Sequence, residues 1–413
     1  MQAELIFTGT ELLLGQVENT HGQFLGRQLS ALGIEVIMRT VVGDNSHNLK
    51  EVFSRALKRS NLIITTGGLG PTTDDVTKET MAGLLGLEMV LHEGALKSMQ
   101  EFFNRKGIDM PKIVTKQAYI PAGATVLPNP EGSAPGIMLE HKGCIIIMLP
   151  GPPNELRAIF NNSVQPYLAK REYKGEVTFS RVFKLTGISE SAVQERLAGL
   201  GGQGNPGLAY IAKPGEVHVR MSARASKADK ARAMVSELAE KVRHRLAGYI
   251  FGADDEVLEE TVGNLLTEKG VTVAVAESCT GGLITQRLTN VPGSSRYLTG
   301  GIIAYNQSIK KKLLGVSPTV LDVHGTASKE CAVAMAEGVC SVTGARLGLA
   351  VTGITEPLQE GRPAKPVGLV YIALAAPDGT CCREFRFPGQ RWGIRWGAAN
   401  AGLNMIRLYL LAQ

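Results

Sequence analysis

The feature that most constrains the fold is an alternation of apolar strand-like runs with amphipathic helical runs. Near the N-terminus, a strand-like run over 4–9 precedes a helical pattern over 19–32, and a second strand-like run covers 34–43. Helical and strand-like runs then alternate up to an apolar strand at 144–149. Strands separated by helices pair in parallel, and the helices cover both faces of the sheet. We therefore predict an α/β domain that ends near a helix at 154–170.

The pattern changes further along the chain. Short alternating strands at 178–185 and 216–222 surround a Gly-rich loop at 201–207 and precede a long polar helix at 227–246. From 256 onwards strands again alternate with helices, and a last helix covers 391–411. A chain of 413 residues has room for about three domains. We predict an α/β domain over 1–170, a small α+β connector over 171–255 and a second α/β domain over 256–413.

Charge and composition exclude several classes of protein. Lys and Arg number 44 against 38 Asp and Glu, and only 5% of residues are aromatic. This mild excess favours small anionic ligands, and without a basic stripe we expect no direct nucleic-acid binding. We find neither a signal peptide nor an apolar run of about 18 residues, so we expect a cytoplasmic chain that does not enter a membrane. The six cysteines form no CxxC pair and are interpreted as reduced, buried thiols.

Polar, Gly-rich segments follow the predicted strands of the first domain. They are GTELLLGQ (9–16), GDN (43–45), TGGLGPTTDD (66–75) and LPGPPNE (149–155). In an open parallel sheet, ligands bind beyond the carboxyl ends of the strands, where glycines let backbone amides approach an anion. Asp74, Asp75 and Glu11 could hold a divalent metal through hard oxygen atoms. The alternative is that the aspartates only cap the next helix.

We therefore predict an anion site in this domain. Its candidate residues are Gly9, Thr10, Glu11, Asp44, Gly67, Gly68, Gly70, Pro71, Thr72, Pro150 and Gly151, with Asp74 and Asp75 as candidate ligands of a divalent metal.

The third segment contains a candidate nucleophile. In VAESCTGGLITQRLT (275–289) a strand ends at Ser278 and is followed by a Gly pair and a helix. A hydroxyl at a strand-to-helix turn, with helix N-terminal amides nearby, suits nucleophilic attack. In the alternative interpretation Ser278 is only the helix N-cap. Cys279 is a rival nucleophile, although a buried structural thiol is the simpler interpretation.

A candidate general base follows in the next strand. The run AYNQSIK places Tyr305 at the tip of a strand over 301–305 and Lys310 in the following helical turn. A lysine with a lowered pKa can take the proton of a serine hydroxyl. The simpler alternatives are that Lys310, beside two further lysines, lies on a solvated helix face, and that Tyr305 is a core aromatic.

These motifs together resemble a known family. GTELLLGQ, TGGLGPTTDD, LPNPEGSAPG (127–136) and LPGPPNE resemble the competence/damage-inducible CinA family, whose N-terminal domain is similar to the molybdopterin-binding fold. AESCTGG, GGIIAYN with its following Lys, the TG step at 352–353 and FPGQR resemble that family's C-terminal nicotinamide-nucleotide amidohydrolase domain. The resemblance covers essentially the whole chain. It implies a molybdopterin-binding-like parallel-sheet domain, an α+β connector and a three-layer α/β amidohydrolase domain.

For the C-terminal domain the resemblance implies hydrolysis of nicotinamide mononucleotide to nicotinate mononucleotide and ammonia, with no cofactor. Ser278 would attack the carboxamide, Lys310 would take its proton with help from Tyr305, and Thr352 would assist in the pocket. The implied substrate-binding residues are Glu277, Gly281, Gly282 and Arg391, the last contacting the anionic substrate. The loop at 354–368 and Gln390 depart from the family's usual Gly-Pro-Asp-containing loop and Asp.

For the N-terminal domain the resemblance implies a metal-dependent ADP-ribose pyrophosphatase. The pyrophosphate would lie on the amides of Gly67, Gly68 and Gly70, and Asp74 and Asp75 would lie near a divalent metal. The partners of the chain would then be small nucleotides in pyridine nucleotide salvage. Apolar residues at 408–412 could pack between two subunits of a homodimer, or simply in the core. The alternative function is a non-catalytic nucleotide- or pterin-binding protein with a degenerate C-terminal domain.

Overall fold

The structure is a computed structural model that describes residues 1–171, 176–200, 204–357 and 365–413. The chain divides into two compact units, Met1–Phe179 with Ala223–Ala233, and Ser180–Ser222 with Met234–Gln413. The predicted connector is not a unit of its own in this division, because most of its residues group with the C-terminal part. The division into three domains therefore stays a prediction.

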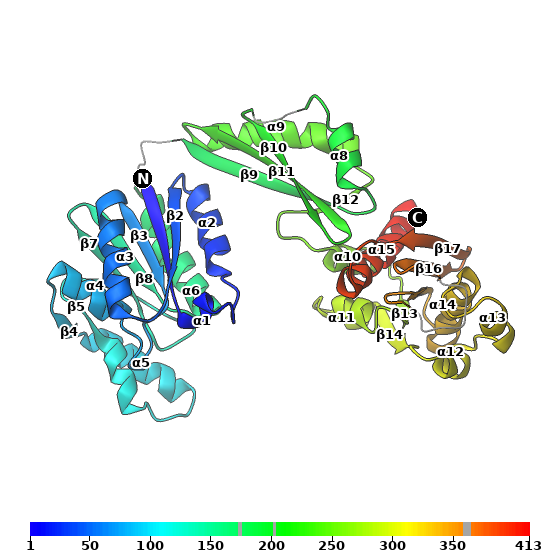
Figure 1. Cartoon of the computed structure of the whole chain (residues 1–413), viewed down its shortest axis with the longest axis horizontal. Coiled ribbons are helices and arrows are strands. Elements are labelled where there is room, and N and C mark those ends of the chain that lie inside the picture. Colours follow the sequence, from blue (N-terminus) through cyan, green and yellow to red (C-terminus); the bar gives the residue numbers. More distant parts are fainter. Residues whose placement is uncertain (172–175, 201–203, 358–364) are drawn as a thin grey trace. The chain divides into compact units, whose positions relative to one another are not determined.

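A six-stranded sheet forms the centre of the first unit (Figure 1). Its strands, in spatial order, are β2 (Glu35–Val42), β1 (Gln2–Thr8), β3 (Leu62–Thr66), β8 (Cys144–Leu149), β7 (Gly136–His141) and β6 (Thr125–Leu127). The first four are parallel, as predicted, whereas β7 and β6 form an antiparallel edge that the sequence analysis did not identify. Lys142 and Gly143 join β7 to β8 with φ angles of 48° and 81°, which suit a tight hairpin turn.

Helices cover both faces of this sheet. Leu5 and Phe7 of β1 belong to a core shared with α2 (His21–Ala31) and α6 (Pro153–Ile159). Ile6 faces the opposite side and packs in a core shared with α3 (Ser46–Arg59) and α4 (Thr77–Leu85). Strands buried on both faces are apolar throughout, which is why the sequence pattern identified them.

The remaining elements of this unit lie between or after the strands. They are α1 (Thr10–Leu13), β4 (Met89–Leu91), α5 (Glu93–Arg105), the 3-10 helix η1 (Lys112–Ala118), β5 (Tyr119–Pro121), the π-helix η2 (Phe160–Val164) and α7 (Gln165–Ala169). The single helix predicted over 154–170 is therefore α6, η2 and α7 in succession.

The middle segment contains a four-stranded sheet with two helices. The strands, in spatial order, are β10 (Gly207–Lys213), β11 (Glu216–Ala225), β9 (Val177–Leu185) and β12 (Ile250–Ala253), and the helices are α8 (Glu190–Arg196) and α9 (Ala228–Leu246). Part of the predicted Gly-rich loop, residues 201–203, lies outside the described residues. Strand β10, which begins where that loop was predicted to end, was missed.

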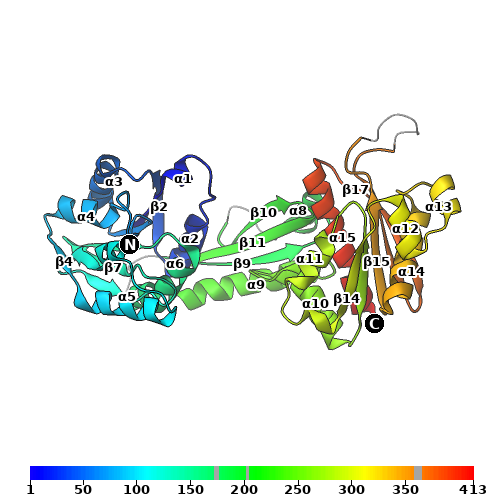
Figure 2. The same ribbon diagram turned by 90° about the horizontal axis from the view of Figure 1, so that it is seen from below.

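The C-terminal segment is a three-layer structure around a five-stranded sheet (Figure 2). Its strands, in spatial order, are β14 (Leu298–Ile303), β13 (Val273–Glu277), β15 (Leu347–Gly353), β16 (Leu369–Ala376) and β17 (Gly379–Arg386). The first three are parallel, and β16 and β17 are antiparallel.

The helices of this segment form the two outer layers (Figure 2). One layer contains α10 (Leu258–Glu268), α11 (Leu283–Thr289) and α15 (Arg391–Ala412); the other contains α12 (Gln307–Leu314), α13 (Pro318–Val323) and α14 (Lys329–Thr343). The 3-10 helix η3 (Ser294–Arg296) precedes β14.

Three further predictions concern surface and solvent. No helix in the described ranges is long and apolar enough to cross a lipid bilayer. All six cysteines are free thiols, but the prediction of burial is wrong for Cys381, which is exposed. At the C-terminus Leu410 is buried in the core and Leu411 is exposed.

Candidate functional site

Ser278 and Lys310 lie side by side in the C-terminal segment. Ser278 follows the last residue of β13, and its N–H donates to the carbonyl of Val351 in β15 at 2.9 Å. Lys310 of α12 reaches back so that its Nζ lies 2.9 Å from Ser278 Oγ. The N-cap of α11 is Gly282, not Ser278, and Lys310 has 0% of its surface exposed. Neither the capping role of Ser278 nor the solvated-face interpretation of Lys310 therefore describes this structure.

Burial lowers the pKa of Lys310. The loss of solvation lowers the pKa of its amine below the ordinary value of 10.5, and nearby thiols oppose this only in part. Lys310 also donates a hydrogen bond to the carbonyl oxygen of Ala304, which fixes the direction of the amine. A neutral amine held in this way has a lone pair that can accept the proton of the Ser278 hydroxyl.

The rival nucleophile Cys279 is chemically unsuited to the role. It is 5% exposed, and burial raises the pKa of its thiol to about 12. Because the thiolate is the nucleophilic form, a thiol with this pKa is inert at neutral pH.

Glu277 has a structural role, which corrects the prediction that it contacts substrate. Its carboxylate is fully buried and accepts hydrogen bonds from the N–H groups of Gly282 (3.0 Å), Ile284 (3.1 Å) and Thr285 (2.8 Å). The hydroxyl of Thr285 donates to it as well, at 2.6 Å. The carboxylate therefore fixes the start of α11, the helix that follows Ser278 in the chain.

The two glycines predicted to bind substrate shape the same turn. Gly281 and Gly282 have φ angles of 59° and 93°, a left-handed conformation that side chains disfavour. The N–H of Gly281 donates to the carbonyl of Ser278 at 3.2 Å, and that of Gly282 to Glu277. Both amides are therefore engaged, and these glycines position Ser278 rather than contact a ligand.

Thr352 is also a positioning residue rather than a catalytic one. The residue is 2% exposed, and its hydroxyl donates to the carbonyl of Thr326 at 2.6 Å. Because that proton is used within the protein, Thr352 serves to hold the loop that contains Thr326.

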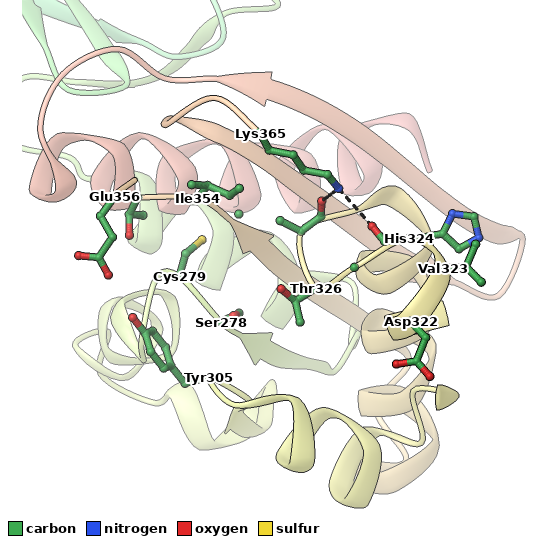
Figure 3. Close-up of a pocket in the computed structure, with 14 residues that line it drawn as sticks. Ser278, Cys279, Tyr305, Asp322, Val323, His324, Thr326, Ile354, Glu356 and Lys365 are labelled. Carbon is green, nitrogen blue, oxygen red and sulfur yellow. Dashed lines mark hydrogen bonds between the residues drawn. The ribbon is translucent and has the colours of Figure 1, made fainter. Parts of the chain in front are cut away.

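Ser278 faces a cavity of about 440 Å³ (Figure 3). Its described lining is Ser278, Cys279, Tyr305, Asp322, Val323, His324, Gly325, Thr326, Ala327, Gly353, Ile354, Thr355, Glu356 and Lys365. Within the described part of the chain, the N–H groups of Cys279 and Thr280 donate to no protein acceptor. Of these two residues only Cys279 lines the cavity, directly after Ser278, so its N–H is the candidate donor to an oxyanion that forms on a bound carbonyl group.

Tyr305, which lines this cavity, is hydrogen-bonded to Arg391. Tyr305 lies two residues beyond the end of β14, not at its tip, and is 59% exposed. Its hydroxyl accepts a hydrogen bond from Nη2 of Arg391 at 2.9 Å, and Nη1 of Arg391 lies 2.8 Å from Glu356 Oε1. The structure thus pairs Tyr305 with Arg391, and in the described residues its hydroxyl does not meet Lys310.

The loop that departs from the family pattern is described only in part, because residues 358–364 lie outside the described residues. Lys365, which follows them, donates to the carbonyls of His324 (3.2 Å) and Ala327 (2.5 Å) on the cavity wall (Figure 3). Gln390, the second departure, is the N-cap of α15 and makes no capping bond with its side chain.

A second cavity, of about 400 Å³, lies at the carboxyl ends of the strands of the first unit. It gathers residues from all the Gly-rich loops of the prediction: Gly9, Glu11, Asp44, Gly67, Gly68, Gly70, Pro71, Asp74, Asp75, Pro150 and Gly151. Thr10 supports this wall, since its N–H (2.8 Å) and hydroxyl (3.1 Å) both donate to Asp44 Oδ2.

Thr72 brings the two candidate metal ligands together. Its hydroxyl lies within hydrogen-bond distance of Asp74 Oδ1 and of Asp75 Oδ2, the latter at 2.5 Å, and can donate its single proton to either. The hydrogen bond from Thr72 is the main reason that the pKa of Asp74 is lowered, so this carboxylate stays ionised. The N-cap of α4 is Val76, and no side chain caps that helix. The aspartates therefore do not act as helix caps.

The acidic lining of this cavity does not favour direct binding of an anion, which the sequence predicted. Its described lining contains five carboxylates (Glu11, Asp44, Asp74, Asp75 and Glu155) and no Lys or Arg. The N–H of Gly67, assigned to a pyrophosphate, instead donates to the carbonyl of Leu149 at 3.0 Å. A phosphate would be repelled from such a wall unless a cation lay between them.

A divalent cation fits this wall only together with phosphate oxygens. Among the described residues no three His, Cys, Asp or Glu side chains gather as a metal site. Mg²⁺ is commonly held by one or two carboxylates with substrate phosphates completing its coordination, which is the arrangement that Asp74 and Asp75 would allow.

Four polar residues of this cavity were not predicted, namely Thr8, Gln117, Ser133 and Glu155. Ser133 donates to Gln117 Oε1 at 2.9 Å, and Glu155 accepts from Asn129 at 2.7 Å. Burial is the main reason that the pKa of Glu155 is raised. Ser133 and Glu155 lie within LPNPEGSAPG and LPGPPNE, so the motifs signalled them, whereas nothing in the sequence signalled Gln117.

Three domain models of known families match successive segments of the chain. Residues 4–170 match the model of a "probable molybdopterin binding domain", 180–252 that of the damage-inducible protein CinA KH domain, and 255–410 that of the CinA C-terminal domain. A competence-damage inducible protein of Desulforudis audaxviator is 51% identical over 413 residues, covering 100% of both chains. The chain belongs to the CinA family.

Other members of the CinA family show the same full-length similarity. A CinA-like protein of Dictyoglomus turgidum is 45% identical over 412 residues, covering 100% of both chains. Among solved structures, a CinA protein of unknown function from Thermoplasma acidophilum is 32% identical over 41% of this chain and 99% of its own, with a TM-score of 0.38. The match to the CinA KH domain gives the middle segment an identity that the sequence analysis did not reach.

Proposed function

We propose that the C-terminal part of this CinA-family protein hydrolyses the carboxamide of a pyridine nucleotide, nicotinamide mononucleotide, to the acid and ammonia. The observation that carries the proposal is the distance of 2.9 Å between Lys310 Nζ and Ser278 Oγ at a buried position open to a cavity. A serine and a lysine in this geometry form a nucleophile and its base.

The first half of the reaction transfers the acyl group to the protein. With Lys310 neutral, the Ser278 hydroxyl donates its proton to Nζ while Oγ bonds to the carboxamide carbon. The carbonyl oxygen becomes an oxyanion near the N–H group of Cys279, which lines the cavity. When the C–N bond breaks, Lys310 returns the proton to the leaving nitrogen, so ammonia departs and an ester remains on Ser278.

The second half uses the same groups in reverse. A water molecule gives a proton to Lys310 Nζ as its oxygen attacks the ester carbon. The ester bond to Oγ breaks, and the proton returns from Lys310 to Ser278. The product is the pyridine carboxylic acid, and the protein regains its starting state with atoms and charge balanced.

The experiment is ammonia release from nicotinamide mononucleotide by the purified full-length chain. We expect turnover by the wild type and a loss of at least about 10³-fold in kcat for Ser278→Ala, because the group that bonds to substrate is gone. Cys279→Ala is the matched control and should retain turnover, since the thiol is inert. A folded Ser278→Ala protein that still releases ammonia at the wild-type rate would refute the proposal.

A second candidate activity belongs to the first unit, where we propose metal-dependent hydrolysis of the pyrophosphate of ADP-ribose. Support comes from the two carboxylates that Thr72 holds together beside the Gly-rich loops. A bound divalent ion would neutralise phosphate charge and lower the pKa of its water. Asp74 and Asp75 would hold that ion, and the loop amides other than that of Gly67 would orient the phosphates.

This second proposal is tested by incubating the full chain with ADP-ribose and Mg²⁺. Formation of AMP and ribose 5-phosphate that ceases in Asp74→Asn and Asp75→Asn would support it. The competing function is nucleotide or pterin capture without chemistry. Calorimetry that shows tight, metal-dependent binding of ADP-ribose with no product would favour that competing function.

A further inference from the structure

Glu356, a carboxylate of the cavity wall, forms an ion pair with Arg391. Nη1 of Arg391 lies 2.8 Å from Glu356 Oε1, and Nη2 donates to the Tyr305 hydroxyl at 2.9 Å. Glu356 and Tyr305 both line the cavity into which Ser278 opens (Figure 3). Both terminal nitrogens of the guanidinium are therefore engaged by side chains that a ligand in this cavity would meet.

Building on the proposed amidase activity, we propose that Glu356 is a specificity-determining residue. It competes with the phosphate of the substrate for Arg391, and thereby weakens the preference for phosphorylated over unphosphorylated pyridine amides.

The chemistry of the guanidinium supports this competition. A carboxylate and a phosphate use the same planar fork of N–H donors, and two anions cannot occupy it together without repulsion. The side chains of Arg391 and Glu356 are 42% and 64% exposed. Solvent and salt screen an exposed pair of this kind, so the competition is modest in size and falls with ionic strength.

The rest of the cavity offers little to offset the loss of Arg391. Of the described lining residues, only Lys365 carries a permanent positive charge, and it already donates to the carbonyls of His324 and Ala327. Asp322 adds a second carboxylate at the opposite end of the cavity from Glu356 (Figure 3). Among the described residues, the guanidinium that Glu356 contacts is therefore the cation that we assign to the substrate phosphate.

The test compares kcat and KM for nicotinamide mononucleotide and nicotinamide riboside, which differ only by the phosphate. In Glu356→Gln we expect KM for the mononucleotide to fall roughly two- to fivefold at low salt, with kcat and the riboside KM unchanged. This decrease in KM should be smaller in about 0.5 M salt, because salt screens the charges of Glu356 and Arg391. Asp322→Asn is the matched control, because it removes a carboxylate from the same cavity away from Arg391.

A double-mutant cycle identifies the partner. If Glu356 acts through Arg391, Glu356→Gln should have no effect on KM in an Arg391→Met background. An unchanged KM in Glu356→Gln, an equal fall for the riboside, or an equal effect of Asp322→Asn would overturn the inference while leaving the amidase activity standing. A wild-type chain that releases ammonia from neither substrate would instead refute the proposed function, and this inference with it.

Discussion

Lys310 shows how a single buried side chain acquires chemistry. An ammonium group removed from water is disfavoured unless an anion faces it, and the polar groups that Lys310 meets are the Ser278 hydroxyl and the Ala304 carbonyl, neither of them charged. The folded protein therefore lowers the pKa of this amine below its ordinary value, which makes the neutral form easier to reach. Burial also raises the pKa of the Cys279 thiol. The same surroundings therefore favour Ser278 as the nucleophile and keep Cys279 in its unreactive thiol form.

The first prediction at this scale concerns pH. Because only neutral Lys310 can accept a proton, kcat/KM for ammonia release should rise with pH, by about tenfold per unit on the acidic side, and level off above the pKa of Lys310. The midpoint should lie below 10.5, the ordinary value for lysine. Lys310→Arg, which stays protonated, should be inactive across the range. A rate that is flat with pH, or one that falls as pH rises, would exclude Lys310 as the base.

The second prediction concerns Glu277. Glu277→Gln places an amide NH₂ among N–H donors and should lower the free energy of unfolding of the C-terminal unit by about 1–3 kcal/mol. The chain has two tryptophans, Trp392 and Trp396, both on α15, so tryptophan fluorescence in urea reports on this unit alone. The exposed Glu268→Gln is the control, and equal destabilisation by both variants would contradict the assigned role.

Ser278 and Lys310 could be identified from the sequence, because each follows a strand that the apolar pattern reveals. Parallel strands have their carboxyl ends at the same edge of the sheet, so the two residues are expected to lie close together. It could not separate residues that touch substrate from those that hold the site. Glu277 and Thr352 are polar residues within the same motifs, yet their hydrogen bonds go to α11 and to the loop at Thr326. Thr326 is distant from Thr352 in sequence, and although α11 follows Glu277 closely, the apolar pattern does not show that its N–H groups bind this carboxylate.

At the scale of elements, η1 holds the loop that carries the candidate metal ligands. Lys116 of η1 donates from Nζ to the carbonyls of Thr72 (2.7 Å) and Asp75 (2.6 Å). The sequence pattern revealed the apolar strands of this unit but not η1 or the antiparallel edge. Short elements of this kind take their conformation from tertiary contacts rather than from a hydrophobic period.

The prediction at this scale is that Lys116→Met weakens Mg²⁺-dependent binding of ADP-ribose, because Asp74 and Asp75 lose their fixed position. We expect a rise in Kd of roughly three- to tenfold, from the loss of two hydrogen bonds to an ammonium group. Calorimetry measures Kd, and ammonia release should be unchanged because the other site lies in the second unit. Lys112→Met, an exposed change in the same 3-10 helix, is the control. Equal weakening by both variants would refute the assignment.

At the scale of the whole molecule, the middle segment stabilises the C-terminal segment. Arg407 of α15 is 3% exposed and donates to the carbonyls of Gly248 (2.9 Å) and Ile250 (3.2 Å). Asn400 of the same helix donates to the carbonyl of Pro214 at 3.0 Å. The sequence analysis assigned the middle segment to a connector and gave it no part in packing, because single buried polar residues on a helix carry no signal of their partners.

The corresponding prediction compares two fragments, 176–413 and 255–413. Both contain Ser278, Lys310 and the cavity, so both should release ammonia. The shorter one leaves Arg407 and Asn400 without these partners and should melt more than about 5 °C below the longer one. Thermal unfolding followed by tryptophan fluorescence measures this difference, and equal melting temperatures would show that the contacts do not stabilise the segment.

The measurement that tests the central claim most directly is the mass of the peptide that carries Ser278 and Cys279, taken after a brief reaction with nicotinamide mononucleotide is stopped with acid. The account predicts a burst of ammonia and an acyl ester on Ser278 that Ser278→Ala lacks. An adduct on Cys279, or a burst of one equivalent of ammonia with Ser278 unmodified, would contradict it.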